Sequence, residues 1–469
     1  MHYLLIFLIC IISFLRAESI PLKEFPNSTD EIVNFTSSAL ENFDEQFAKF
    51  KDQSLIDLNF NNIVTAWGNI IEPLFTKAVI LSFLPLTTLE LDVIQKADLE
   101  VKELQNKLHL AMDDPKALSL FLHFAKDPKN QKTMTPHQIY IVNHILQNIE
   151  GEGLKKEIVS LQNTLSTYKS QSFIYAKGHN KEKTLPKNRK ITLLSWNVCF
   201  LEGGISMLFG GVLPWQKRMD RIVNKIQELD ADILCLQEVF SPEASHTLLQ
   251  RLQSQYTHFY YDMGPNPIGF SMKNLGIPGG LFVASKYPLK EENFIPYKKE
   301  ETPSYRAYGF FSADIYSKGK KLAHLITTHL QPGSEIEDRN YRLLQTKAIS
   351  HTLKEMKFPA LLCGDFNIVK NSQEAQEIFT LYESAPYQGL DWTCCELRDY
   401  WWKTKQDTTA FLALPHEKEW LDYFFYLKGS SKNPPHLFTE ILVANDLNFP
   451  EDALSDHQIL FTTITLGAK

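Results

Sequence analysis

The chain has 469 residues, of which 44% are hydrophobic and 22% are charged, and these are globular values that exclude a disordered chain. Its 48 basic and 55 acidic side chains give a formal net charge of −7, so the composition lacks the overall basicity typical of generic nucleic-acid binding. With 20 glycines, 23 prolines and no internal repeat, the sequence is neither collagen-like nor a solenoid, and its length predicts two or three domains.

An apolar segment opens the chain. LLIFLICIISFL follows the first three residues and precedes Arg16 and Ala17. This run has the length of a signal peptide and is short for a membrane span. It lacks a basic n-region, and Leu15 is large for a position two before the cleavage site, so an uncleaved anchor is the alternative. The interpretation favours a signal peptide over residues 1–17 and an exported protein, either secreted or held at the cell surface or in the periplasm.

The following segment, from about Glu41 to Lys177, has the spacing of amphipathic helices. Thr135-Pro136-His137-Gln138 predicts a helix start, with a threonine cap, proline at the first position and glutamine at the capping-box position. These patterns predict an all-α domain over residues 18–185. Apolar residues recur three and four positions apart at Val93, Ala97, Val101, Leu104, Leu108 and Ala111.

The pattern changes after the segment between Lys177 and Lys190, which carries six basic residues, one acidic residue, a glycine and a proline. This composition is typical of a solvated linker and predicts the domain boundary. Beyond it, short apolar runs alternate with helical patterns, which predicts a layered α/β domain over residues 190–469. The expected strands are TLLSW (192–196), DILCLQE (232–238), LFVAS (281–285), HLITTHL (324–330), ALLCGDF (360–366), DYFFYL (422–427) and ILFTTITL (459–466).

Polar side chains stand at the ends of these expected strands. Carboxylates and amides gathered at one rim suit a hard divalent cation, which prefers oxygen ligands. Two histidines at the same rim can transfer a proton or donate a hydrogen bond to a phosphate. Each residue alone is usually a solvated cap, but the set in this order favours a catalytic rim. Its members are Asn197, Glu238, His329, Asp365, Asn367, Asp422, Asp456 and His457.

Six motifs carry a family resemblance: SWNV, LQEVF, THLQ, GDFN, LDYFF and SDH, in that order. Together they resemble the endonuclease/exonuclease/phosphatase superfamily of magnesium-dependent phosphoesterases, over essentially all of residues 191–469. The resemblance implies an α/β four-layer sandwich, in which two mixed β-sheets are flanked by helices, here preceded by the all-α domain. It also implies a Mg²⁺ cofactor. Glu238 would be the principal metal ligand, with Asn197 beside it holding metal or phosphate and Asp456 completing the metal side.

The same resemblance implies the catalytic roles. Asp365 and Asn367 would orient the attacking water and contact the phosphate. His457 would be the general base or would stabilise the charge that builds on the phosphate. Asp422 would hold His457 in its useful tautomer, and His329 would donate to a phosphate oxygen in the transition state.

The substrate is a separate question, because members of one fold act on different phosphodiesters. The GDLNYR-like and WCDR-like signatures of inositol-polyphosphate phosphatases are absent, whereas GGLFVASKYPL (279–289) resembles neutral sphingomyelinases. The leading hypothesis is therefore cleavage of sphingomyelin-type phospholipid at a membrane surface. The alternatives are a secreted or surface nuclease and a binding protein on an inactive scaffold. No protein partner is predicted.

Two loops bear on that substrate. Animal-type neutral sphingomyelinases place an aspartate five residues before a lysine in an active-site loop, and Glu301 precedes Arg306 by five here. Arg306 is therefore a candidate substrate-binding residue, with two ordinary surface charges as the equal alternative. The apolar loop 203–215 offers Leu208, Phe209, Val212 and Leu213 as candidates for contact with a bilayer.

Two further patterns are structural. Residues 62–75 and 135–154 resemble the helical N-terminal region of thimet-type oligopeptidases, but the zinc motif HExxH is absent, so an accessory domain without peptidase activity is expected. The six cysteines form no CxxC pair and no Cys/His spacing of the zinc type, so buried free thiols are expected. They are Cys10, Cys199, Cys235, Cys363, Cys394 and Cys395.

Overall fold

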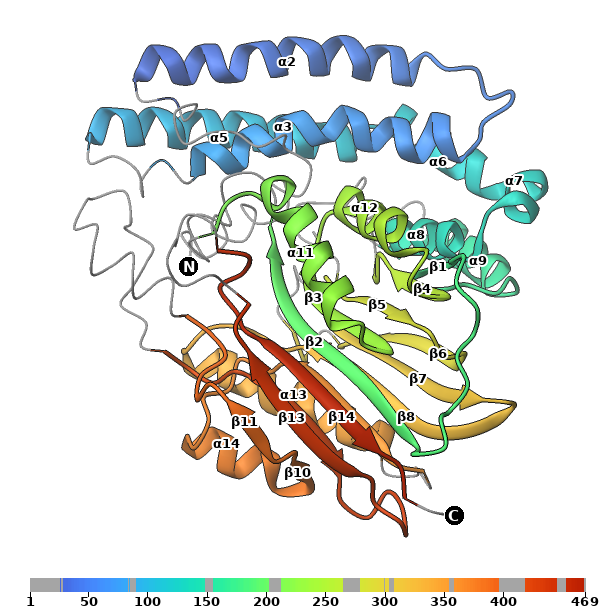
Figure 1. The fold of residues 1–469 in the computed structure, drawn as a ribbon. Coiled ribbons are helices and arrows are strands. Elements are labelled where there is room, and N and C mark those ends of the chain that lie inside the picture. Colours follow the sequence, from blue (N-terminus) through green and yellow to red (C-terminus); the bar gives the residue numbers. More distant parts are fainter. Residues whose placement is uncertain are drawn as a thin grey trace. The chain divides into compact units, whose positions relative to one another are not determined.

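The computed structural model describes residues 26, 28–82, 84, 90–147, 155–201, 212–264, 279–298, 300–302, 308–353, 358–395, 418–444 and 453–467 (Figure 1). The chain divides into two compact units, Met1–Ser172 with Pro265–Ile277 and Phe173–Gly264 with Pro278–Lys469. The expected signal peptide lies outside the described residues. None of the helices among the described residues is both long enough and apolar enough to span a membrane.

The first unit is built from helices. They begin at Thr29, earlier than expected, because Ser28 caps the first helix by accepting from the Glu31 N–H at 3.3 Å. The expected capping box forms, since Thr135 and Gln138 exchange hydrogen bonds of 2.9 and 3.2 Å. The elements are α2 (Thr29–Lys51), the π-helix η2 (Asn61–Thr65), α3 (Ala66–Ser82), α5 (Leu91–Met112), α6 (Pro115–Lys126), α7 (Pro128–Thr133), α8 (Pro136–Gln147) and α9 (Lys155–Leu165).

The second unit contains two sheets. The larger has the strand order β1-β4-β5-β3-β2-β14-β13-β11, and the smaller has the order β10-β12-β9-β8-β7-β6. The strands are β1 (Ile174–Lys177), β2 (Lys190–Phe200), β3 (Ile233–Val239), β4 (His258–Tyr261), β5 (Phe282–Ser285), β6 (Leu289–Pro296), β7 (Gly309–Ser317), β8 (Lys320–His329), β9 (Ala360–Asp365), β10 (Tyr382–Ser384), β11 (Tyr387–Gly389), β12 (Asp422–Leu427), β13 (His436–Leu442) and β14 (Ile459–Thr465).

The two sheets pack face to face through one apolar core. Leu193 of β2 and Cys235 of β3 meet Ala313 of β7, Leu325 of β8 and Cys363 of β9 in this layer, and all five side chains are fully buried. The alternation of side chains along each strand sends the next residues to the outer faces, where helices cover them. The expected four-layer sandwich of two mixed sheets flanked by helices is confirmed.

Each outer face is covered by its own helices (Figure 1). Met219, Ile222 and Ile226 on one side of α11 (Trp215–Leu229), with α12 (Pro242–Leu252), pack on the larger sheet. The smaller sheet carries α13 (Ile336–Leu353), α14 (Gln373–Ile378) and the 3₁₀-helix η4 (Phe379–Leu381). Ser350 of α13 hydrogen-bonds Tyr382 of β10 at 2.6 Å, and the ring of Phe379 lies 4.6 Å from that of Phe425 in β12.

The junction between the units differs from the expectation. Ile174–Lys177, expected to be helical, is strand β1 because it pairs antiparallel with β4 of the second unit. The segment after it, expected to be a solvated linker, is tied to the same unit: the N–H groups of Gly178 and Lys183 donate to Thr257 and Lys286 carbonyls at 2.8 and 2.7 Å. The division therefore falls at Phe173, before the predicted boundary at 185–190.

Candidate active site

The strand ends of both sheets meet at one rim, and the pairing register explains why. His329 at the end of β8 lies beside Asp365 at the end of the parallel strand β9, and Asp422 at the start of antiparallel β12 faces Asp365 from the other side. In the larger sheet, Asn197 of β2 lies beside Gln237 of parallel β3, next to Glu238. Because the carboxyl ends of parallel strands share an edge, residues far apart in sequence become neighbours.

Asp422 and His457 form a buried pair. Asp422 Oδ2 lies 2.8 Å from His457 Nδ1, and both residues are at most 4% exposed. The other ring nitrogen, Nε2, lies 3.7 Å from Asp365 Oδ2. The carboxylate therefore fixes the orientation of the ring and turns Nε2 toward the centre of the rim.

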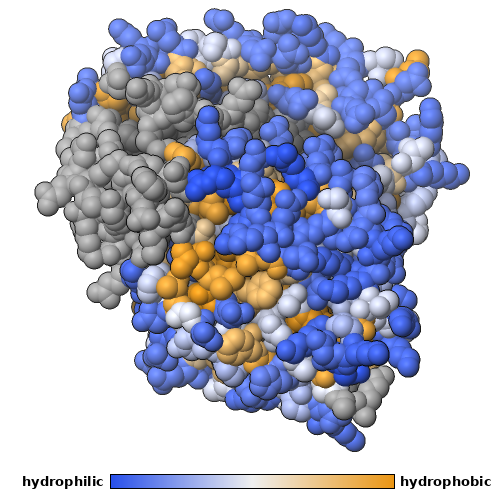
Figure 2. All heavy atoms as spheres, viewed as in Figure 1, coloured by the Kyte–Doolittle hydropathy of each residue, from blue (hydrophilic) through white to orange (hydrophobic). Residues whose placement is uncertain are grey.

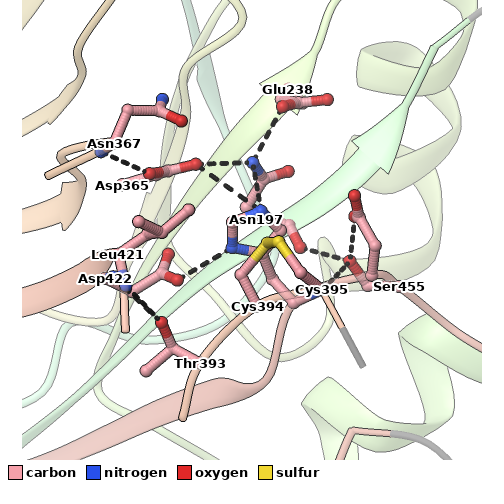
Figure 3. Close-up of a disulfide and its surroundings, with 12 residues drawn as sticks. Asn197, Glu238, Asp365, Asn367, Thr393, Cys394, Cys395, Leu421, Asp422 and Ser455 are labelled. Atoms are coloured by element: carbon pink, nitrogen blue, oxygen red, sulfur yellow. Dashed lines mark hydrogen bonds and ion pairs between the residues drawn. A yellow bond between two sulfur atoms is a disulfide. The ribbon is translucent and has the colours of Figure 1, made fainter. Parts of the chain in front are cut away.

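Asn197 links the two sheets at this centre (Figure 3). Its Nδ2 donates to Glu238 Oε1 at 2.8 Å and to Asp365 Oδ2 at 3.0 Å, and it lies 3.5 Å from His457 Nε2. Its Oδ1 accepts from the Cys199 N–H at 3.0 Å, which sets the amide in this orientation. A neutral amide thus separates two carboxylates that would otherwise repel each other.

The GDFN turn places Asp365 and Asn367. Gly364 has a φ of 141°, and a Cβ there would lie 1.9 Å from the Thr328 carbonyl oxygen, so only glycine permits this approach of β9 to β8. The Asn367 N–H donates to Asp365 Oδ1 at 2.9 Å, and Asn367 Nδ2 donates to the Leu330 carbonyl at 3.1 Å. Asn367 has a φ of 52°, the left-handed conformation that asparagine adopts more readily than most residues.

Glu238 and His329 complete the other side of the rim. Glu238, at a φ of 60°, has an Oε1 that lies 3.9 Å from His329 Nε2, and the same nitrogen lies 3.6 Å from Asp365 Oδ2. The ring of Tyr308 packs 5.3 Å from the imidazole of His329. A left-handed glutamate at the end of a buried strand costs free energy, and such conformations concentrate at functional sites.

The charges of the rim shift two pKa values. Burial and then the neighbouring charge of Asp422 raise the pKa of Asp365 to about 7, against the opposing effect of His457 and Asn197. Burial alone would lower the pKa of His457, but the negative charges of Asp422, Asp365 and Asp456 outweigh it and raise the pKa to about 10. The rim thus concentrates negative charge in a buried place, which a cation would relieve.

The donor set fits a divalent cation. Ligand atoms of Glu238, His329 and Asp365 lie within 4.8 Å of one another, as do those of Asp365, Asp422 and His457. Carboxylate oxygens predominate, as Mg²⁺ requires. The fit rests on this chemistry and on the shared, buried negative charge.

Asp456 and Arg306 are the two remaining predicted site residues. Asp456 belongs to neither group of clustered ligand atoms among the described residues. Its Oδ1 accepts from Ser455 Oγ at 3.4 Å, and its carbonyl accepts from the Cys395 N–H at 3.0 Å. Arg306 lies outside the described residues. Glu301, its predicted companion, accepts from the Lys298 N–H at 2.8 Å, so it caps its own turn.

Arg218 is a buried residue that the sequence analysis did not identify, and its guanidinium binds backbone carbonyls near the rim. This guanidinium is 1% exposed, and it donates to the carbonyls of Val198 at 2.8 Å, of Cys199 at 2.5 Å and of Leu213 at 2.5 Å, and also to that of Leu454. Burial lowers its pKa to about 10, against the charges of Cys199, Asp456 and Glu238. An arginine in the first turn of a helix is usually exposed, so only the packed structure reveals it.

The expectation of free thiols is wrong for one pair. Cys394 and Cys395 form a disulfide between adjacent residues, beside the site (Figure 3). Cys199, Cys235 and Cys363 are free and buried, as expected. In the apolar loop, Val212 is 1% exposed and packs against Cys199 and Ala453, so it is unavailable to a bilayer. Leu208 and Phe209 lie outside the described residues.

Comparison with known proteins adds a family. The sequence profile of the Endonuclease/Exonuclease/phosphatase family matches residues 194–457, more than half of the chain. Sphingomyelinase C of Leptospira interrogans is 26% identical over 272 residues, which are 54% of this chain and 46% of that protein. Phospholipase C of Staphylococcus aureus is 26% identical over 246 residues, 48% of this chain and 71% of that one.

Among solved structures, the beta toxin of Staphylococcus aureus aligns with a TM-score of 0.46 and 23% identity, over 58% of this chain and 99% of that one. The alignment with the Leptospira protein spans less than half of its length. The family profile covers every strand end of the rim, from Asn197 to His457. The chain therefore belongs to the endonuclease/exonuclease/phosphatase family.

Proposed function

We propose that this protein is an exported, magnesium-dependent phosphodiesterase that hydrolyses sphingomyelin-type phospholipid to ceramide and phosphocholine. The observation that carries the proposal is the Asp422–His457 pair. The other ring nitrogen of His457, Nε2, lies 3.7 Å from Asp365 Oδ2 within a buried cluster of carboxylates. The relatives named Sphingomyelinase C and Phospholipase C support a phospholipid as the substrate.

The metal site is assigned to the carboxylate side of the rim. Glu238 is the principal ligand, because its side chain is the most exposed of the clustered carboxylates and faces both Asp365 and His329. Asn197 and Asp456 are the further candidates in the proposal. When bound, the cation supplies charge stabilisation for the phosphate as its negative charge grows.

The remaining roles follow from where each side chain lies. Asp365 and Asn367 orient the attacking water, and the Asn367 N–H holds Asp365 Oδ1 while leaving Oδ2 toward the centre. His457, oriented by Asp422, takes the proton of that water through Nε2 in its neutral form, or hydrogen-bonds to the phosphate through Nε2 in the protonated form that its raised pKa favours. His329 Nε2 faces the same centre and donates to a phosphate oxygen. The water oxygen joins phosphorus, the bond between phosphorus and the ceramide oxygen breaks, and the ceramide oxygen takes up the proton that the water loses.

An apolar area near the rim supports a lipid surface as partner. Figure 2 shows apolar side chains gathered over β13 and β14, with hydrophilic surface to the right of them. Leu442 pairs with Ile459, two residues after His457, so this area begins beside the rim. Leu442 and Phe461 are only partly buried there, and Val443 is 38% exposed. Such groups stabilise an interfacial position when they enter a bilayer.

Two parts of the proposal concern the rest of the chain. Export rests on the apolar segment of residues 4–15, which has signal-peptide length and position. The helical unit is proposed to be an accessory domain without peptidase activity, because the sequence lacks the zinc motif HExxH.

The experiment is one purified protein assayed on three phosphodiesters. Sphingomyelin in mixed micelles, supercoiled plasmid DNA and inositol phosphates are each incubated with magnesium and with a chelator. Magnesium-dependent release of phosphocholine, with intact plasmid, supports the proposal. Nicked plasmid with untouched sphingomyelin would assign the nuclease activity instead, and no turnover of any substrate would remove the enzyme proposal.

A further inference from the structure

The main chain of a short segment, Thr393 to Cys395, lies between the main chain at Glu419, just before Asp422, and the main chain at His457. Its main chain forms an antiparallel bridge on each side, since Cys394 pairs with Glu419 and with His457. Thr393 and the two cysteines are at most 2% exposed. The segment is therefore a buried link that touches both halves of the pair.

The contacts to the histidine side are made by backbone groups. The Cys395 N–H donates to the Asp456 carbonyl at 3.0 Å, and the Gln458 N–H donates to the Thr393 carbonyl at 2.7 Å. These two bonds hold the residues immediately before and after His457. The position of the imidazole along the rim therefore depends on where the segment lies.

The contacts to the aspartate side run through one hydroxyl. Thr393 Oγ1 accepts from the Leu421 N–H at 2.9 Å and from the Asp422 N–H at 3.0 Å, as Figure 3 shows. The Thr393 N–H and the Cys394 N–H also donate to the Glu419 carbonyl, at 2.8 and 2.9 Å. Removing this hydroxyl would leave two buried N–H groups without that acceptor, which costs about 1–3 kcal/mol for each unsatisfied group.

The disulfide restrains the segment that makes these contacts. Cys395 has a φ of 77°, in the left-handed region that residues with a Cβ rarely adopt. The bond between the adjacent sulfur atoms closes a small ring around the Cys394–Cys395 peptide, and a closed ring limits the conformations open to the backbone. The ring thus holds in place the N–H of Cys395 that supports Asp456 and, through it, His457.

We infer that Thr393–Cys395 is a positioning segment for the catalytic pair, with the Thr393 hydroxyl and the disulfide each fixing one side. The inference rests on the proposed phosphodiesterase function. The segment acts through Asp422 and His457, so its loss should lower kcat and leave KM nearly unchanged. Glu238 belongs to β3, and Asn367 follows β9.

The first test compares Thr393→Val with Thr393→Ser on sphingomyelin in mixed micelles. Valine keeps the shape but removes the acceptor, whereas serine keeps the hydroxyl. We expect Thr393→Val to lose about 10- to 100-fold in kcat, as sub-ångström misplacement of catalytic groups does, with less than twofold change in KM, and Thr393→Ser to recover most of the rate. A Thr393→Val rate within twofold of the wild type, or a Thr393→Ser variant as slow as valine, overturns the role of the hydroxyl.

The second test addresses the disulfide in the folded wild-type protein. A dithiol such as dithiothreitol reduces the bond with two electrons: each cysteine sulfur gains a proton and the dithiol becomes a cyclic disulfide. Cys199, Cys235 and Cys363 are already free thiols, so within the described part of the chain only this bond can change. The reduced fraction is counted by mass after alkylation, and kcat should fall in proportion to it and return on reoxidation.

The variant Cys394→Ala/Cys395→Gly is the matched control. Glycine tolerates the left-handed φ without the bond, so this variant should be slower than the oxidised wild type and indifferent to dithiothreitol. Reduced wild type with full kcat overturns the role of the disulfide, as does a double variant that still loses activity in the dithiol. Should the wild type cleave no phosphodiester, the proposed function fails. An active wild type whose kcat changes neither with Thr393→Val nor on reduction of the disulfide defeats only this inference.

Discussion

Asp422 Oδ2 lies 2.8 Å from His457 Nδ1, although the two residues come from different sheets and their motifs are 35 residues apart. The pair joins the two sheets of the second unit. Strand β12 carries the aspartate in the smaller sheet, and the loop before β14 carries the histidine in the larger one. Its geometry depends on the packing of the whole sandwich.

The first prediction concerns this pair. His457→Ala should lose several orders of magnitude in kcat, because it removes the group that faces the water. Asp422→Asn should lose less, about 10²- to 10⁴-fold, since the ring remains but its tautomer is no longer fixed. Steady-state kinetics at saturating magnesium measures both. Asp391→Asn, an exposed change near the same segment, is the control, and an Asp422→Asn variant as fast as this control would refute the assignment.

Glu238→Gln should abolish magnesium-dependent turnover while the protein stays folded. The amide cannot supply the negative charge that a hard cation requires, and loss of several kcal/mol of charge stabilisation corresponds to roughly 10³-fold or more in rate. Activity is measured across a magnesium titration, with circular dichroism to verify folding. Glu243→Gln on the exposed side of α12 should be unaffected. Near-normal activity of Glu238→Gln at saturating magnesium rules the ligand assignment out.

Magnesium should also stabilise the protein without any substrate. A cation that binds only the folded state adds about 2.7 kcal/mol at a concentration 100 times its Kd, because it relieves the repulsion among Glu238, Asp365 and Asp422. Thermal unfolding of the wild type should therefore shift upward with magnesium and return with a chelator. The same shift in Glu238→Gln would mean that the ion binds elsewhere.

Arg218→Met should destabilise the second unit strongly. The guanidinium donates to the carbonyls of Val198, Cys199, Leu213 and Leu454, and removing it leaves these buried acceptors without that donor. The expected cost is about 1–3 kcal/mol for each carbonyl that is left without a partner. Urea unfolding provides the measurement, and Arg221→Met on the exposed face of α11 is the control. Equal midpoints for the two variants would show that Arg218 is dispensable.

Acid should loosen the helical unit through buried histidines. Burial lowers the pKa of His137 and of His144 to about 4, while the unfolded chain takes up these protons near pH 6.5. Each group therefore contributes stability that is present above pH 6.5 and is lost as the pH falls toward 4, up to about 3 kcal/mol per group. Hydrogen exchange of α8 amides between pH 7 and 4.5 should show the loss, and His137→Gln should reduce it. An unchanged pH slope in that variant contradicts this account.

How much of this molecule the sequence could predict depends on the range of the interactions. A compact apolar run predicts a buried strand from neighbouring residues alone. DYFFYL is expected to be a strand over 422–427, and it is strand β12 over the same residues. The strand-end residues converge as expected, since shared register is a property of parallel strands. The spacing predicts a helix for Ile174–Lys177, which is a strand. Its partner β4 lies more than 80 residues away, so the residues near Ile174–Lys177 in the sequence do not indicate this pairing.

The contacts that position the Asp422–His457 pair could not be predicted from the sequence either. Thr393 is an ordinary residue in a loop until its hydroxyl is seen between two backbone N–H groups of another segment. The sequence predicts free thiols at Cys394 and Cys395, which form a disulfide. The backbone conformation that permits this disulfide depends on the bridges to Glu419 and His457, which are distant in sequence. The sequence predicts the rim residues, and the packing shows the contacts that position them.

In the proposed reaction, water attacks the phosphorus of a phospholipid headgroup. Hydrolysis of sphingomyelin micelles in ¹⁸O-labelled water, followed by mass spectrometry of both products, tests it most directly. The account predicts one labelled oxygen in phosphocholine, none in ceramide, and no product when a chelator removes the magnesium. Label in ceramide, product formed without a divalent cation, or no phosphocholine at all would contradict it.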